Sequence, residues 1–200
     1  MIKKIKSFSK GLSRVSFFLI LLTFFMSLNE NTTAATQDKK LPQGVSSENV
    51  MIIELKYGKV LIELLPKLAS KHVERIKTLV NQGFYDGIVF HRVIDGFMAQ
   101  TGDPTGTGMG GSKLPDIVAE FSSHPHSRGV LSMARAQSPN SANSQFFIVT
   151  QDSLFLDRQY SVFGRVISGM EFVDKIKKGA GSNGQVANPD KMIKVSMYKH

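Results

Sequence analysis

The chain has 200 residues, of which 42% are hydrophobic and 14 are phenylalanine, so it is long and apolar enough for one globular domain with a tail. It has no cysteine, which excludes disulfides, thiolate nucleophiles and cysteine-bound metals. The formal net charge of +9 divides into +4 for residues 1–35 and +5 for the rest. Because no cluster of basic residues with interleaved aromatics follows residue 35, we do not expect nucleic-acid binding.

Residues 1–35 have the three parts of a secretory signal peptide. A basic start ends at Arg14, an apolar run of about 14 residues extends from Val15 to Leu28, and a polar stretch leads to the small residues 33–35. The apolar run is shorter than the ~20 residues that a membrane-spanning helix needs. The pattern predicts an exported protein, periplasmic in the first instance. An uncleaved anchor that holds the protein at the membrane, or secretion from the cell, is the alternative.

A linker and one domain follow. Residues 36–48 are polar, contain Pro42 and Gly44 and show no apolar period, which is typical of a flexible linker. Residues 49–200 then carry the strand and helix patterns of a single folded domain.

The domain begins with a hairpin and a helix. Apolar residues spaced by two in 50–55 and 59–65 predict a half-buried hairpin. Ser70 is a suitable N-cap for a helix over 71–82, whose buried side carries apolar residues three and four positions apart. Gly83 follows at the position where a left-handed residue ends a helix.

Residues 90–103 predict a second hairpin, with Asp95-Gly96 at its turn. Large apolar side chains crowd this hairpin around a single arginine, Arg92. Because neighbouring residues on a strand face opposite sides, we expect His91 to point away from Arg92 and to be a hydrogen-bonded core histidine.

Three further polar patterns carry weaker signals. Residues 102–113 match GxGxxG, but no strand leads into them and no amphipathic helix follows, so a flexible wall beside a site is the better interpretation. His124 and His126 form a pair without a third ligand nearby, and we predict no metal site. The serines of 138–144 lack the G-x-S-x-G elbow of a serine hydrolase and indicate a polar loop.

The rest of the chain adds strands and a second helix. Strands are predicted at 130–134, 145–150, 160–166 and 193–197, and a short helix at 170–177. The total is about eight strands and two helices, without a βαβ period. These features predict a mainly β fold: a closed eight-stranded antiparallel β-barrel capped by two α-helices.

Several long motifs resemble those of one known family. They are Phe90-His-Arg-Val-Ile-x-Gly-Phe-Met-x-Gln-x-Gly-Asp103, Gly129-Val-Leu-Ser-Met-Ala134, Asn143-Ser-Gln-Phe-Phe-Ile148, Phe155-Leu-Asp and Tyr160-Ser-Val-Phe-Gly164. In this order they closely resemble the cyclophilins, which are peptidyl-prolyl cis-trans isomerases. The resemblance extends from residue 49 to the C-terminus. It implies an eight-stranded barrel capped by two helices, with a substrate groove on its outer wall.

The resemblance also implies which residues form the site. Arg92, Phe97 and Gln100 correspond to the catalytic positions. Arg92 is the catalytic arginine, Phe97 belongs to the proline pocket, and Gln100 should hydrogen-bond the substrate backbone. The other substrate-binding positions are Met98, Ala134, Arg135, Ala136, Phe147, Phe155, Leu156 and Tyr160. No cofactor and no metal are implied.

Three of these positions depart from the pattern of many family members. Phe155 stands where many eukaryotic cyclophilins have tryptophan, so an indole N–H that favours tight cyclosporin binding is lost. Tyr160 stands where many members have histidine, and Arg135 replaces an asparagine that acts through its backbone. The last two variants resemble the bacterial branch of the family, and we expect catalysis to survive all three.

Two functional hypotheses follow from the resemblance and the N-terminal segment. The leading one is an isomerase that accelerates X-Pro bond rotation during the folding of exported proteins. The alternative is a chaperone (holdase) module in which the same groove captures proline-containing segments and turnover is incidental. In both, the partners are proline-containing polypeptides and the protein is a monomer. It meets a membrane only if the N-terminal segment is not cleaved.

Overall fold

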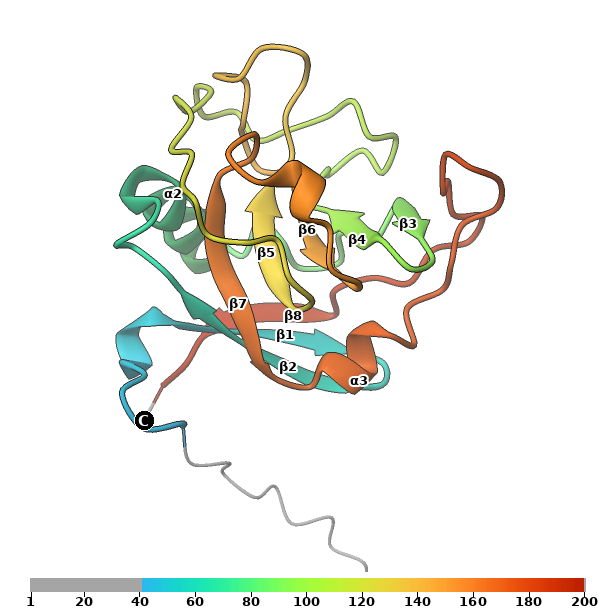
Figure 1. Ribbon diagram of the computed structural model, residues 1–200. Coiled ribbons are helices and arrows are strands. Elements are labelled where there is room, and N and C mark those ends of the chain that lie inside the picture. Colours follow the sequence, from blue (N-terminus) through green and yellow to red (C-terminus); the bar gives the residue numbers. More distant parts are fainter. Residues whose placement is uncertain (1–40, 200) are drawn as a thin grey trace, which may run out of the picture. The chain divides into compact units, whose positions relative to one another are not determined.

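Eight strands form one antiparallel sheet in the order β3-β4-β6-β5-β7-β2-β1-β8, and the sheet curls into a barrel (Figure 1). The computed structural model describes residues 41–199; the predicted signal peptide and the first residues of the predicted linker lie outside them. The strands are β1 (Val50–Leu55), β2 (Gly58–Leu64), β3 (Arg92–Ile94), β4 (Met98–Thr101), β5 (Val130–Met133), β6 (Phe146–Val149), β7 (Val162–Ser168) and β8 (Lys194–Met197). The helices are α2 (Ser70–Asn81) and α3 (Met170–Val173), with the short 3-10 helices η1 (Ser47–Asn49) and η2 (Leu154–Leu156).

The first hairpin has the predicted bounds to within one residue. Buried residues alternate with half-exposed ones along β1 and β2, and Ile53 lies opposite Val60. Gly58 opens β2 with φ +148°, and a Cβ there would lie 2.5 Å from the ring of Phe172. The turn therefore needs glycine both for its backbone conformation and for the close packing of α3 on β2.

The barrel closes through an irregular segment and not through a regular ladder between the edge strands β3 and β8. Residues 87–93 exchange backbone hydrogen bonds with residues 179–192, among them Phe90 N to Asp190 O at 2.8 Å. The predicted architecture is confirmed. The barrel is closed by a loop whose sequence lacks the alternation of apolar and polar residues that predicts a strand.

Strand β6 separates two hydrophobic clusters, and all of its residues are buried. Phe146 and Ile148 belong to the main core inside the barrel. Phe147 and Val149 belong to a smaller cluster on the outer wall. Because successive side chains of a strand face opposite sides, a continuous apolar run is the pattern of a strand covered on both faces. The smaller cluster marks the part of the outer wall where the candidate site lies.

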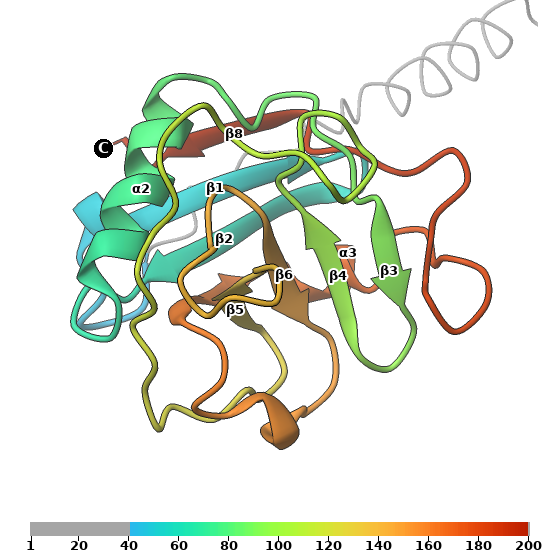
Figure 2. The same ribbon diagram turned by 90° about the horizontal axis from the view of Figure 1, so that it is seen from above.

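The two helices pack on different parts of the sheet, α2 on β7 and β8 and α3 on β2 (Figures 1 and 2). Helix α2 matches the predicted helix, and Gly83 after it has φ +67°, as expected. Helix α3 is shorter than predicted: it ends at Val173 and not at Lys177. The reason is a tertiary contact: the backbone N–H of Lys177 is donated to Asp190 Oδ2 at 3.0 Å and is not part of the helix.

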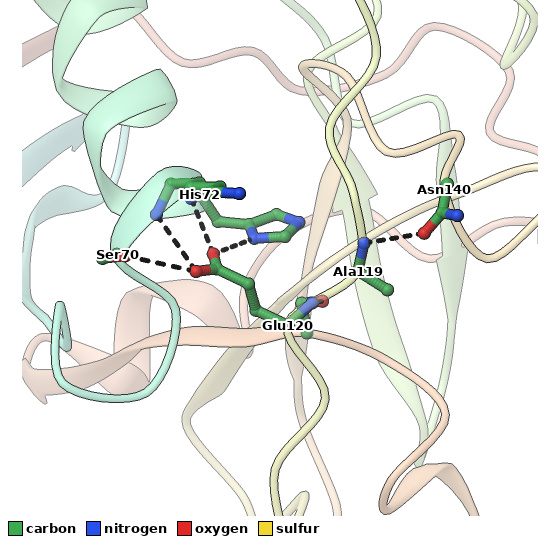
Figure 3. Close-up of polar contacts among 7 residues, drawn as sticks. Ser70, His72, Ala119, Glu120 and Asn140 are labelled. Carbon is green, nitrogen blue, oxygen red and sulfur yellow. Dashed lines mark hydrogen bonds and ion pairs between the residues drawn. The ribbon is translucent and has the colours of Figure 1, made fainter.

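The N-terminus of α2 is capped from a distant loop, which corrects the prediction that Ser70 is the N-cap. The N-cap residue is Ala69, and it makes no side-chain cap. Glu120 supplies the acceptors instead (Figure 3). Its carboxylate accepts from the backbone N–H groups of Lys71 and His72 at 3.3 and 3.1 Å, and from His72 Nδ1 at 2.6 Å. A carboxylate here satisfies N–H groups that have no partner within the helix and lies at the positive end of the helix dipole.

His72 is buried with only one of its ring nitrogens paired. Nε2 has no hydrogen-bond partner among the described residues. Burial lowers the pKa of His72 below its ordinary value of 6.5, although the hydrogen bond to Glu120 opposes this shift. Burial alone raises the pKa of Glu120, but hydrogen bonds from the His72 ring and from the backbone outweigh it and leave that pKa lowered. Protonation of either group therefore works against the folded state.

We expect the free energy of unfolding to decrease as the pH falls below 6.5. When the folded-state pKa is the lower one, the unfolded chain binds the proton more readily, so the contribution of His72 is complete above the unfolded-state pKa and is lost as the pH falls through the folded-state pKa. Burial also lowers the pKa of His91, which adds to the same trend.

The variant His72→Asn keeps a donor toward Glu120 but does not titrate. Its thermal unfolding, followed between about pH 8 and about pH 5, should depend less on pH than that of the wild type. A variant that keeps the full wild-type pH dependence would rule out His72 as a source of it.

Candidate active site

Three neighbouring strands place an arginine, a glutamine and a phenylalanine in one row. Arg92 of β3 lies opposite Gln100 of β4, and Gln100 lies opposite Phe147 of β6. Directly opposed residues of antiparallel strands point to the same face of the sheet. Because Phe147 belongs to the outer hydrophobic cluster, all three side chains lie on the outer wall of the barrel. The row combines a charge, an amide and an apolar surface.

The guanidinium of Arg92 is held on two sides. Nε donates to the carbonyl oxygen of Asn183 at 2.9 Å, and Nη1 donates to Gln100 Oε1 at 3.1 Å. Among the described residues Nη2 has no hydrogen-bond partner, so its N–H groups can serve a ligand. Gly184 brings the neighbouring carbonyl close, because it has φ +70° and packs on Ile94 with no room for a Cβ.

Gln100 is fixed in turn by Gln145. Gln100 Nε2 donates to Gln145 Oε1 at 2.9 Å. Gln145 Nε2 donates to the carbonyl oxygens of Gly108 and Gly110 at 3.0 and 2.8 Å. A chain of hydrogen bonds therefore runs from the glycine-rich segment to Arg92, and it fixes which end of each amide is oxygen.

The glycine-rich segment is folded around the buried carboxylate of Asp103. This carboxylate accepts from the backbone N–H groups of Thr105, Gly108 and Gly110 at 2.8, 2.6 and 3.1 Å. Burial alone raises the pKa of Asp103, but these hydrogen bonds and that of the Thr105 hydroxyl lower it to about 2. The carboxylate is therefore ionised at neutral pH. The predicted wall beside the site is built around this fixed charge.

An apolar pocket of about 270 Å³ opens beside the row. Every predicted site residue except Ala136 lines it: Arg92, Phe97, Met98, Gln100, Ala134, Arg135, Phe147, Phe155, Leu156 and Tyr160. Ala136 lies in a neighbouring pocket of about 380 Å³, together with residues 108–112. Because both pockets share Gln100, Ala134 and Arg135, we treat them as one groove on the outer wall.

The 270 Å³ pocket has a buried floor and an exposed rim. Met98, Phe147 and Leu156 are buried and form the floor. Phe155 is 67% exposed, and its ring centroid lies 5.5 Å from that of Phe97. These two rings give the rim an apolar surface without a side-chain N–H donor.

Arg135 contributes its side chain to the wall of the pocket. Its Cζ lies 4.8 Å from the ring centroid of Tyr160, which is a cation–π contact. Its guanidinium also donates to the carbonyl oxygens of Ala136 at 3.0 Å and Gln159 at 3.3 Å. The Tyr160 ring in turn meets Phe147 edge to face, with centroids 5.6 Å apart. Arg135 therefore supports Tyr160, which also lines the pocket.

The histidines that the sequence analysis considered do not line the groove. His91 is buried as predicted, but neither ring nitrogen has a hydrogen-bond partner among the described residues, which corrects the expectation of a hydrogen-bonded histidine. Burial lowers the pKa of His91 and so favours the neutral ring. Across residues 41–199, no three His, Asp or Glu side chains gather as a metal site requires.

Residues 50–197 match the family model described as cyclophilin type peptidyl-prolyl cis-trans isomerase/CLD. The chain belongs to the cyclophilin family. As a cyclophilin it has peptidyl-prolyl cis-trans isomerase activity, which its named relatives share. The match covers every strand of the barrel and all the residues that line the groove.

Similar proteins come from bacteria and eukaryotes. A probable peptidyl-prolyl cis-trans isomerase of Brucella suis is 55% identical over 162 residues, which are 75% of this chain and 83% of the relative. The crystal structure of a cyclophilin from Hirschia baltica matches with a TM-score of 0.69 and 31% identity, covering 76% of this chain and 75% of the other. A Cryptosporidium parvum cyclophilin, crystallised in the presence of the dipeptide Ala-Pro, matches with a TM-score of 0.69 and 29% identity over 76% and 99% of the two chains.

Sequence reasoning missed two residues that hold the arginine of this cyclophilin in place. Gln145 is part of a motif that supports the resemblance, but the resemblance implies no role for it. The sequence feature that could have indicated a role for Gln145 is a polar residue directly before the wholly buried strand β6. Asn183 contributes only a backbone carbonyl from a loop, so its side-chain type gives no signal.

Replacing Gln145 with leucine removes the link between the glycine-rich segment and Gln100 at similar side-chain volume. We expect kcat/KM for an X-Pro peptide to fall roughly tenfold, the equivalent of one hydrogen bond that supports the transition state. Gln82→Leu, at the exposed end of α2, is the matched control. A protease-coupled assay that finds both variants as active as wild type would show that Gln100 needs no such support.

Proposed function

We propose that this cyclophilin accelerates X-Pro bond rotation during the folding of exported proteins, with Arg92 as its catalytic residue. The observation that carries the proposal is a guanidinium held by Asn183 and Gln100 at the edge of an apolar pocket. Proline-containing polypeptides are the substrates. The crystal structure of the Cryptosporidium parvum relative in the presence of the dipeptide Ala-Pro supports this substrate class.

The chemistry needs no nucleophile and no metal. Rotation about a peptide C–N bond meets a barrier of about 18–20 kcal/mol, because resonance gives the bond double-bond character. X-Pro bonds therefore isomerise slowly, over roughly tens to hundreds of seconds. In the twisted transition state this resonance is lost and the proline nitrogen gains a lone pair. A donor aimed at that nitrogen stabilises the twisted form over the planar one and so lowers the barrier.

Arg92 suits this role because a guanidinium is always charged and presents several N–H groups in a fixed plane. Asn183 and Gln100 engage Nε and Nη1, which leaves Nη2 to meet the proline nitrogen. The apolar floor formed by Phe147 and its neighbours holds the proline ring, while Phe97 covers it from the rim.

The rest of the groove serves the residues next to the proline. The Gln100 amide donates one N–H to Gln145, and its second N–H is left for the substrate backbone. The walls beside it are formed by Ala134, Arg135 and Ala136. Binding on one side of the X-Pro bond holds that side still while the other side turns, which is the geometry that a rotation requires.

Export is supported by the N-terminal sequence, with its basic start and apolar run. Within residues 41–199 no helix has the length and hydropathy to cross a membrane. We propose a periplasmic or secreted monomer that acts without a cofactor. N-terminal sequencing of the exported protein distinguishes a cleaved signal peptide from a retained anchor.

The substitution Arg92→Ala tests the catalytic role. The fold should be kept, because Arg92 lies on the outer wall and is part-exposed. We expect turnover of an Ala-Pro peptide to slow by roughly 10²–10³, the cost of removing one donor to a transition state. The measurement is the protease-coupled assay, with circular dichroism as the control for folding. A folded variant with wild-type turnover would remove Arg92 from the mechanism.

The same variant separates the isomerase from the holdase alternative. A holdase needs the groove to bind extended chains but does not need a donor for the twisted bond. If the alternative were correct, Arg92→Ala would still prevent the aggregation of a proline-free client. We expect instead that refolding limited by X-Pro rotation is accelerated by the wild type and not by the variant.

A further inference from the structure

His126 lies behind the 270 Å³ pocket without lining it, and it is fully buried. Its Nδ1 lies 2.8 Å from Asp157 Oδ1, and its Nε2 lies 2.8 Å from Ser132 Oγ. A carboxylate only accepts hydrogen bonds, so Nδ1 carries a proton, and in the neutral ring Nε2 accepts from the Ser132 hydroxyl. Both ring nitrogens are therefore used inside the protein.

These contacts fix both ends of η2, the short helix that carries Phe155 and Leu156 into the pocket. Asp157, at its C-terminal end, accepts from the backbone N–H of His126 at 2.8 Å in addition to the ring. Ser153, at its N-terminal end, donates its backbone N–H to the carbonyl oxygen of His126 at 2.8 Å. One residue thus holds the start and the end of this pocket wall.

The imidazole also supports the pocket floor. Its ring is stacked on that of Phe147, with centroids 6.5 Å apart and an interplanar angle of 19°. The edge of Tyr160 meets it with the same centroid distance and an angle of 79°. Ser132, which anchors Nε2, lies directly opposite Phe147 in the sheet. The hydrogen bonds of His126 therefore start from the strand next to Phe147 and end at η2.

Asp157, His126 and Ser132 have the composition of a hydrolytic triad, but they cannot act as one. Ser132 is fully buried beneath the outer cluster. A nucleophile must meet the substrate at bonding distance, and no peptide carbonyl reaches this hydroxyl. The polar group must therefore serve the placement of its neighbours.

We infer that, given the isomerase function proposed above, His126 is a positioning residue that sets the distance of Phe147 and η2 from Arg92. Apolar contacts are not directional and allow ring surfaces to slide over one another. The two ring hydrogen bonds are directional and hold the imidazole, and with it the floor and the wall, in one place. Placement matters because a shift of about 1 Å in a bound group can cost ~10²-fold in rate.

The test compares His126→Asn with His72→Asn. Both histidines are fully buried and both donate Nδ1 to a carboxylate, but His72 lies at the start of α2 and does not touch the pocket. Asparagine keeps a donor toward the carboxylate in each case. Only His126→Asn removes the ring behind Phe147 and the bond to Ser132. Thermal unfolding of both variants measures their structural cost.

Exchange NMR on an Ala-Pro peptide measures the rotation rate on the enzyme separately from peptide affinity. We expect His126→Asn to lower kcat/KM about tenfold or more, mainly through the on-enzyme rate, while His72→Asn keeps the wild-type rate where it is folded. If both variants lose activity only in proportion to the fraction unfolded, the positioning role is wrong. A wild type that fails to turn over the peptide would instead count against the proposed function.

Two milder variants keep the proposal testable if His126→Asn does not fold. Ser132→Ala removes the partner of Nε2, and Asp157→Ala frees the C-terminal end of η2. Each should slow the on-enzyme rate, and their effects should be less than additive because they act through one ring. Folded variants with the wild-type rate in both cases would overturn the proposal.

Discussion

The register of β3, β4 and β6 is the constraint on which the site depends. Arg92, Gln100 and Phe147 share the outer wall only because they are directly opposed in the sheet. A slip of one residue would turn a charged guanidinium into the barrel and expose the core residues Val93 and Ala99. The burial of the core therefore fixes the site, and the two cannot be altered independently.

The hydrogen-bond partners of Arg92 agree with the role proposed for it. Asn183 and Gln100 hold the guanidinium with neutral oxygens, and no carboxylate pairs with it within residues 41–199. A carboxylate would neutralise the charge and compete with the proline nitrogen for the remaining N–H groups. Neutral acceptors orient the group and leave its charge for the twisted bond. The buried carboxylate of Asp103 accepts instead from backbone N–H groups of the glycine-rich segment.

Local signals predicted the local parts of the structure. Alternation of apolar residues located the first hairpin, and Gly83 located the end of α2. The resemblance of long motifs named every residue that lines the pocket beside Arg92, and also Ala136, which lies in the neighbouring pocket. Contacts between loops could not be predicted in this way. Glu120 caps α2 from a distant segment, and His126 reaches η2 through its backbone as well as its ring. Neither contact produces a periodic pattern in the sequence. The spacing of apolar residues also predicted too long a helix α3. That spacing carries no information about the hydrogen bond from the Lys177 backbone N–H to Asp190.

The central claim is that Arg92 acts on the twisted X-Pro bond and contributes little to binding the planar one. The most direct measurement is exchange NMR on the wild type and on Arg92→Lys with the same X-Pro peptide, which yields the affinity and the on-enzyme rotation rate from one sample. Lysine keeps the charge but loses the planar fork that Asn183 and Gln100 hold. We predict a large fall in the rotation rate with affinity nearly unchanged. An unchanged rotation rate with weakened affinity would contradict the claim and make Arg92 a binding residue only.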